Sequence, residues 1–195
     1  IGMFLFTGVT FAIFIMVERK VKSPVLSLDL FRNSVFSISS FISFALGVGL
    51  FATLMFMPIY FQGIAGTSAT KSGYLMIPMT AAQIFGGLTV GKIVERTGKY
   101  KIYGLIGLLA IVAGLLLLAT LKPDTPLVLA VIYTMFVGFG FGVSTPIYTV
   151  SLQNVVQERL LGVATSTAQV CRQAGGIIGV TVTGSVLSAR IGSSG

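Results

Sequence analysis

Long apolar stretches alternate with short polar stretches along the whole chain. Five of the apolar segments are long enough to cross a bilayer as helices, which takes about 20 residues. They are expected at residues 35–60, 73–94, 102–121, 127–151 and 162–189. An earlier and shorter apolar segment, residues 1–17, is interpreted as the end of another helix. The pattern predicts an all-α integral membrane protein with five complete transmembrane helices and the end of a preceding one.

The composition restricts the possible functions. Of the 195 residues, 54% are hydrophobic and only 9% are charged, which is too apolar for a water-soluble domain. The net charge of +8 comes from short loops and forms no continuous patch, so nucleic acid is not expected as a partner. One cysteine and no histidine exclude an internal disulfide and a Cys/His metal site. No nucleophile–base pair or phosphate-binding loop indicates an enzyme, and we expect no catalytic residue, metal or cofactor.

The loop charges orient the helices. Loops alternate between the two sides of the membrane, and one side holds nine of the 13 basic residues, at 18–32, 91–101 and 152–160. The other side holds two, Lys71 and Lys122. Lys and Arg collect in cytoplasmic loops, so the first group is predicted to face the cytoplasm. We therefore expect a multi-pass protein of the cell membrane, with membrane lipid around its helices.

The most charged stretch, residues 91–101, lies between the second and third expected spans. It contains Gly91, Glu95, Arg96, Gly98 and Lys99. The two glycines suit a tight turn, because glycine adopts positive φ without strain. We predict that Glu95, Arg96 and Lys99 form a charge cluster, and that Glu95 accepts from the first N–H groups of the third span. In a second interpretation these charges only set the orientation of the chain.

Four motifs resemble one family of transporters. Gly91-x-x-x-Glu95-Arg96-x-Gly98-Lys99-x-Lys101 is similar to the loop signature of the major facilitator superfamily, Gly-x-Leu-x-Asp-Arg-x-Gly-Arg-Lys, and departs from it at Glu95 and Lys99. Three further motifs resemble the fourteen-helix drug:proton antiporters of that superfamily. They are Tyr60-Phe61-Gln62-Gly63-x-x-Gly66-x-Ser68 with Ser72-Gly73-Tyr74-x-x-x-Pro78, Asp29-Leu-Phe31-Arg32-Asn33, and Arg172-Gln173-x-Gly175-Gly176-x-x-Gly179. Together they extend over essentially the whole chain.

The resemblance implies the C-terminal helix bundle of a multidrug exporter of the quaternary-ammonium type. Residues 1–34 would hold the end of an inter-bundle helix and a cytoplasmic loop, residues 35–190 the bundle, and residues 191–195 a flexible end. The bundle would be truncated, and the missing N-terminal bundle would be its partner. Such a protein exports amphipathic compounds in exchange for protons by alternating access. A metabolite transporter of the same fold, or a non-transporting membrane sensor or assembly protein, is the alternative.

Several residues are candidates for the substrate and proton pathway. Phe41, Phe44, Phe51 and Met55 recur at helical spacing on one face of the first complete span. The resemblance implies that this helix lines the central cavity, where aromatic and Met side chains suit varied amphipathic molecules. A lipid-facing or packing stripe is the other interpretation. Gln83, a polar side chain at mid-span, either faces the cavity or hydrogen-bonds another helix.

Among the candidate site residues, Arg172 is the one whose placement inside the membrane is expected to cost the most free energy. It lies roughly 15 Å into the last span, at 1.5 Å per residue. A cation at that depth costs at least ~2.5 kcal/mol, so a partner is expected. Two partners are open: a carboxylate of the missing bundle, or water and substrate in the cavity. Alternatively, the side chain snorkels to the cytoplasmic interface. No acidic residue lies inside an expected span, so the proton-carrying carboxylate is expected in the missing half.

Overall fold

The described part of the chain is entirely helical. The computed structural model describes residues 28–192, apart from the side chains of residues 28, 29, 159 and 187–192. Its elements are η1 (Leu28–Arg32), α2 (Ser34–Gly63), α3 (Ala69–Thr97), α4 (Tyr100–Ala119), α5 (Leu127–Gln153), η2 (Glu158–Leu160) and α6 (Leu161–Gly192). The expected all-α class is confirmed. The predicted helix end at residues 1–17, most of the following loop and residues 193–195 of the predicted flexible end lie outside the described residues.

The long helices have the lengths that membrane spans require. Among the described residues, α2, α3, α4 and α5 are long and apolar enough to cross a membrane. α6 is the fifth long helix, with 32 residues. Side-chain caps start two of them, since the Asn33 side chain accepts from the N–H groups of Val35 and Phe36, and Ser68 accepts from Lys71. Such caps satisfy N–H groups that have no partner within the helix.

The loop between α3 and α4 is shorter than the sequence predicted. α3 continues to Thr97 and ends at Gly98, which has φ of 64° and donates from its N–H to the Val94 carbonyl over 2.8 Å. α4 begins at Tyr100, so only Gly98 and Lys99 connect the two helices. Gly91 and the residues up to Thr97 are helical because Lys, Glu and Arg are good helix formers. The prediction that Gly91 belongs to the turn is therefore wrong, whereas Gly98 has the predicted positive φ.

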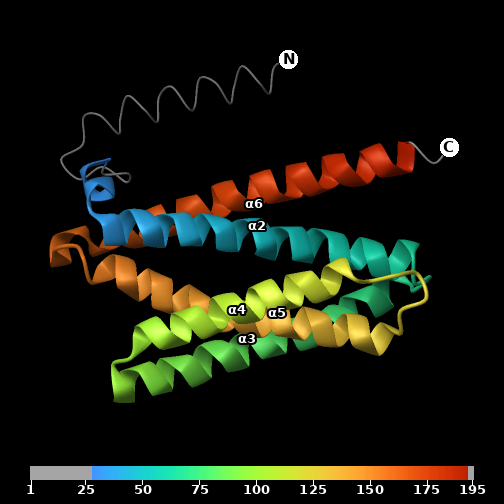
Figure 1. The fold of residues 1–195 in the computed structure, drawn as a ribbon, viewed down its shortest axis with the longest axis horizontal. Helices are drawn as coiled ribbons and strands as arrows, with labels where there is room; N and C mark the ends of the chain where they lie inside the picture. Colours follow the sequence, from blue (N-terminus) through green and yellow to red (C-terminus); the bar gives the residue numbers. More distant parts are fainter. Residues whose placement is uncertain (1–27, 193–195) are drawn as a thin grey trace.

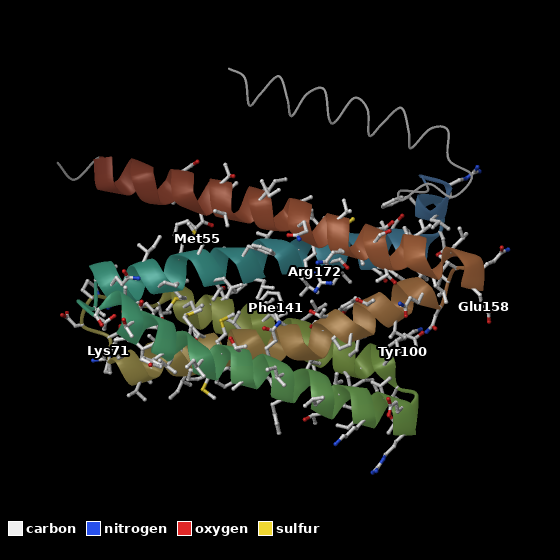
Figure 2. All side chains as sticks on the ribbon, turned by 180° about the vertical axis from the view of Figure 1, so that it is seen from behind. Met55, Lys71, Tyr100, Phe141, Glu158 and Arg172 are labelled. Carbon is white, nitrogen blue, oxygen red and sulfur yellow. The ribbon has the colours of Figure 1, made fainter. Side chains whose placement is uncertain are left out.

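Two groups of helices form the bundle (Figure 1). α2 and α6 lie side by side, and α3 and α4 each pack on α5. α5 also contacts α2 and so joins the two groups. The largest buried cluster lies where α2, α3, α4 and α5 meet; its members are Leu46, Met79, Ile111, Val137 and Phe141. The Phe141 side chain is fully buried in this cluster and lies near the middle of the bundle (Figure 2).

The connections lie at the two ends of the bundle. Tyr100 and Glu158 lie at one end, and Lys71 lies at the other (Figure 2). α2 and α6 therefore both start at the Tyr100 end, whereas α3 and α5 both start at the Lys71 end. This arrangement matters for the candidate site, because it makes α2 parallel to α6 and α3 parallel to α5.

Candidate functional site

The contact between α2 and α6 depends on glycine. A side chain at Gly47 of α2 would collide with the backbone oxygen of Arg172, and a side chain at Gly175 of α6 would collide with the backbone oxygen of Phe44. Small residues at such positions let two helix backbones approach closely inside a membrane. The contact holds the backbone of Arg172 directly against α2.

The contact between α3 and α5 repeats this arrangement. A side chain at Gly142 of α5 would collide with the backbone oxygen of Gln83, and a side chain at Gly86 of α3 would lie 2.8 Å from the backbone oxygen of Phe139. The two positions on each helix are three residues apart: 172 and 175, 83 and 86, 44 and 47, 139 and 142. Arg172 and Gln83 therefore hold equivalent positions in two matching helix pairs.

The equivalence identifies an inverted repeat. It pairs α2 with α5 and α3 with α6, and the members of each pair run in opposite directions along the bundle. A two-fold axis perpendicular to the helices relates such elements, as in transporters built from inverted-topology repeats, whose substrate sites lie near the bilayer midplane. Arg172 and Gln83 each stand out in the sequence as polar side chains within apolar spans, but only the backbone contacts show that they are equivalent.

Arg172 lies near the middle of the bundle and is directed from α6 toward α2 and α5 (Figure 2). Its side chain is partly buried, and its Nε atom is fully buried with no hydrogen-bond partner. No acidic side chain forms an ion pair with it within the part of the chain that the structure describes. A guanidinium group is charged and only donates hydrogen bonds, so the buried Nε–H lacks an acceptor.

Ser40 on α2 is a second polar group without a partner. Its side chain is 2% exposed, and its hydroxyl makes no hydrogen bond. Ser40 lies one helical turn before Phe44, and Arg172 lies about one turn before Gly175, which faces Phe44. The Arg172 backbone itself faces Gly47, so the Ser40 backbone lies about one to two turns nearer the start of the two parallel helices than the Arg172 backbone. Long side chains of a helix are directed toward its N-terminus, so the Arg172 side chain extends toward Ser40. The sequence analysis did not select Ser40, since a serine in an apolar helix has no distinguishing signal.

The predicted aromatic face of α2 divides in two. Phe44 and Phe51 are partly buried against α6, where a side chain at Gly176 would lie 2.6 Å from the Phe51 ring. Phe41 and Met55 are 71% and 54% exposed. The structure thus brings Phe44 and Phe51 into a helix contact and leaves Phe41 and Met55 on the surface of α2.

An apolar groove lies along the contact between α3 and α5. It has a volume of about 580 Å³ and is lined by Pro78, Ala81, Ala82, Phe85, Met135, Phe136 and Phe139. None of these seven side chains is charged or a hydrogen-bond donor. Gln83 is adjacent in sequence, is partly buried, and makes no side-chain hydrogen bond with another described residue. Sequence patterns did not reveal the groove, because its residues come from two helices whose register only the fold defines.

The charged residues at the end of α3 are brought together but do not pair. Glu95, Arg96 and Lys99 are all exposed, and no ion pair joins them within the described residues. No side chain caps the start of α4, so the predicted hydrogen bonds from its N–H groups to Glu95 are not formed. Glu95 instead lines a cavity of about 250 Å³ between α3, α4 and α5, together with Tyr100 and Pro146.

Comparisons with known proteins place this chain among transporters. The family model described as Major Facilitator Superfamily matches residues 1–180. The multidrug transporter protein MdtP of Bacillus subtilis is 37% identical over 193 residues, which is 99% of this chain and 36% of that protein. Multidrug resistance protein 3 of the same organism is 32% identical over 95% of the chain and 36% of its own length. A tetracycline resistance determinant of Streptomyces rimosus is 32% identical over 91% of the chain and 52% of its own length.

Proposed function

Because the chain belongs to the major facilitator superfamily, we propose that it is part of a multidrug efflux transporter that exports amphipathic compounds in exchange for protons by alternating access. The superfamily consists of multi-pass membrane transporters, so the chain is not an enzyme. The names of three relatives refer to multidrug transport, multidrug resistance and tetracycline resistance. Our proposal includes the fourteen-helix architecture, on the motifs quoted above.

The repeated glycine contact is the observation that carries the proposal. It relates α2–α6 to α3–α5 by a two-fold axis perpendicular to the helices, and it sets one polar side chain, Arg172 or Gln83, near the middle of each pair. In transporters with inverted repeats, substrate and coupling-ion sites lie near the midplane. Arg172 and Gln83 are therefore our candidates for the substrate and proton pathway, together with Phe41, Phe44, Phe51 and Met55 of α2.

The apolar groove favours amphipathic substrates over polar metabolites. Its lining combines Phe85, Phe136 and Phe139 with Met135, and aromatic and Met side chains adapt to varied apolar shapes. A site for a sugar or an amino acid would need several convergent hydrogen-bonding groups, because each polar group of the substrate loses water on binding. This composition is the reason to prefer an exporter of amphipathic compounds over a metabolite transporter.

Transport requires more than this chain. The chain spans about a third to a half of the length of the relatives quoted above. Alternating access needs two bundles that rock around a site at their interface. The acidic side chains that the structure describes, Glu95, Asp124 and Glu158, are exposed near helix ends. The proposal therefore assigns the proton-carrying carboxylate to the N-terminal bundle of the same transporter.

Dye efflux from intact cells tests the proposed function. Cells that express the full-length protein should extrude ethidium faster than cells with an empty vector, and a proton uncoupler should abolish the difference. Extrusion that persists after the proton gradient has collapsed would exclude proton exchange. Equal dye retention in the two strains would exclude multidrug export and favour a metabolite transporter or a sensor.

The isolated chain provides a second test. Reconstituted in liposomes with a proton gradient, it should show no substrate-dependent proton flux, because the second bundle is absent. The full-length protein, prepared in the same way, is the positive control. A saturable flux through the isolated chain would show that two copies assemble into a working transporter, and would contradict the division of roles proposed here.

A further inference from the structure

We propose that Arg172 and Ser40 bind the carboxylate of an exported amphiphile, so that anionic compounds are among the substrates of the transporter. The inference rests on the proposed export function and names a substrate class for it. It starts from two buried polar groups on the facing sides of α2 and α6, about one to two turns apart along the helices, neither of which has a partner in the described structure.

Arg172 has the donor geometry that a carboxylate requires. Its planar guanidinium presents a fork of N–H groups that matches the two carboxylate oxygens, and such pairs are among the strong hydrogen bonds in proteins. The Nε atom is fully buried and has no acceptor. Because one of the fork's donors is buried between helices, an anion that pairs with it must enter the bundle.

Ser40 supplies a second donor. Hydroxyl groups elsewhere in these helices donate to a carbonyl of the preceding turn: Ser43 to Ser39 at 2.9 Å, Thr53 to Gly49 at 2.8 Å, and Ser151 to Ile147 at 2.9 Å. The buried hydroxyls of Ser40 and of Ser144 on α5 make no such bond, and of these two Ser40 lies on the helix that packs against Arg172. An oxyanion held by Arg172 would give the Ser40 hydroxyl an acceptor.

The carboxylate of a substrate fits this place better than a carboxylate of the protein. The acidic side chains that the structure describes lie near the ends of helices and cannot reach the middle of α6. An acid on a helix of the N-terminal bundle is the competing partner, and the two-dye experiment distinguishes it from a substrate carboxylate. The Ser40 hydroxyl and the Arg172 Nε atom are both buried, so a substrate carboxylate meets them only by entering between α2 and α6. The aromatic side chains of Phe44 and Phe51, on the same helix as Ser40, provide apolar surface for the rest of an amphiphile.

Export of two dyes of opposite charge tests the inference in the full-length transporter. Fluorescein carries a carboxylate and ethidium carries a positive charge. In Arg172→Gln, fluorescein efflux should fall about tenfold to hundredfold, as expected for the loss of hydrogen bonds to a charged group. Ethidium efflux, which needs no acceptor-binding site, should fall much less, so that the ratio of ethidium efflux to fluorescein efflux rises. Ser40→Ala should lower fluorescein efflux alone, by several-fold, and Arg172→Lys should give an intermediate loss because it keeps the charge without the fork.

The control is Gln173→Ala, which removes an exposed polar side chain directly beside Arg172. It should leave the efflux of both dyes unchanged. Parallel loss of both dyes in Arg172→Gln and in Ser40→Ala, at normal amounts of protein in the membrane, would overturn the inference and indicate an acidic partner in the other bundle. Unchanged fluorescein efflux in Arg172→Gln would overturn it as well. Wild-type export of ethidium without fluorescein would refute this inference alone, whereas failure to export either dye would refute the proposed function.

Discussion

The helix pairs α2–α6 and α3–α5 make equivalent backbone contacts, but the side chains next to these contacts differ. Gly47 faces the backbone of Arg172 in the first pair, and Gly142 faces the backbone of Gln83 in the second. One turn before Phe44 lies Ser40, which is 2% exposed; one turn before its equivalent Phe139 lies Met135, which is 39% exposed. The first pair therefore carries a buried hydroxyl at the position where the second lines an apolar groove, whereas both pairs carry a polar side chain at the position of Arg172 and Gln83.

The comparison indicates that the glycine contacts determine how closely the helices pack, whereas the neighbouring side chains determine what the site can bind. The close approach of the helices needs only glycine at a few positions and imposes no charge or polarity on the neighbouring side chains. The same contact can then support an anion site in one pair and an apolar groove in the other. Substitutions at the glycines should affect both pairs alike, whereas substitutions of side chains should affect one pair only.

The largest effect is expected from Gly47→Ala and Gly142→Ala. In each variant the new methyl group would collide with a backbone oxygen of the neighbouring helix, which cannot move away as a flexible side chain can. Overpacking of this kind costs about 1–3 kcal/mol or more. Thermal unfolding of the purified full-length protein should show a similar loss of stability for both variants, because their positions are equivalent.

The matched controls are Gly73→Ala in α3 and Gly162→Ala in α6. A side chain at either position would meet no atom within 4 Å, and alanine favours a helix over glycine by up to about 1 kcal/mol. Both variants should be at least as stable as the wild type. If Gly47→Ala is as stable as Gly162→Ala, the close contact of α2 with α6 is wrong; if only one of Gly47→Ala and Gly142→Ala is destabilised, the two pairs are not equivalent.

A smaller effect should separate the aromatic residues of α2. Phe51→Ala removes a ring that packs on Gly176 and should lower the free energy of unfolding by about 1–2 kcal/mol, since the ring is only partly buried. Phe41→Ala removes a ring that is 71% exposed and should change stability by less than about 0.5 kcal/mol. Thermal unfolding of both variants makes the comparison, and equal losses would contradict the division of the aromatic face.

The sequence predicted the helices more completely than the contacts between them. Apolar runs and flanking charges identify the spans, because length and hydropathy decide whether a segment can cross a bilayer. Gly98 was correctly placed in the turn after α3, since a helix often ends at a glycine with positive φ. The end of α3 was placed too early, because charged residues were taken as loop, although Lys, Glu and Arg favour helix once a helix has begun.

The candidate site could be predicted only in part. Arg172 was selected because a cation inside an apolar span is costly wherever it points. Ser40 gave no signal, since a serine in a helix commonly bonds to its own backbone, and only the structure shows that this one does not. The equivalence of Arg172 with Gln83 depends on which glycine faces which carbonyl. That register is set by the packing of helices far apart in the sequence, so no local pattern contains it.

The smallest effect is expected at Glu95, where the two helix pairs also differ. Residue 83 is equivalent to residue 172, and residue 86 to residue 175. By the same relation, Glu95 of α3 is equivalent to Gly184 of α6. Glu95 is near the C-terminal end of α3, where the helix dipole disfavours an anion. Stability of α3 therefore does not account for a carboxylate here. Its place in the cavity shared with Tyr100 and Pro146 suggests that it acts between α3 and its neighbours α4 and α5.

We therefore expect Glu95→Gln, which keeps the size and removes the charge, to lower the transport rate of the full-length protein by about two- to fivefold, the effect of a charge interaction of 0.3–1 kcal/mol. Glu95→Asp, which restores the acid of the family signature, should keep most of the rate. Lys101→Gln is the control, because it also changes the net charge by one unit, in the opposite direction, at an exposed position next to Tyr100. The transport rates are measured as substrate uptake into inverted membrane vesicles and are normalised to the amount of protein. If Glu95→Gln transports like the wild type, the charges at this turn only orient the chain, because the positive-inside rule depends on Lys and Arg and hardly on Glu.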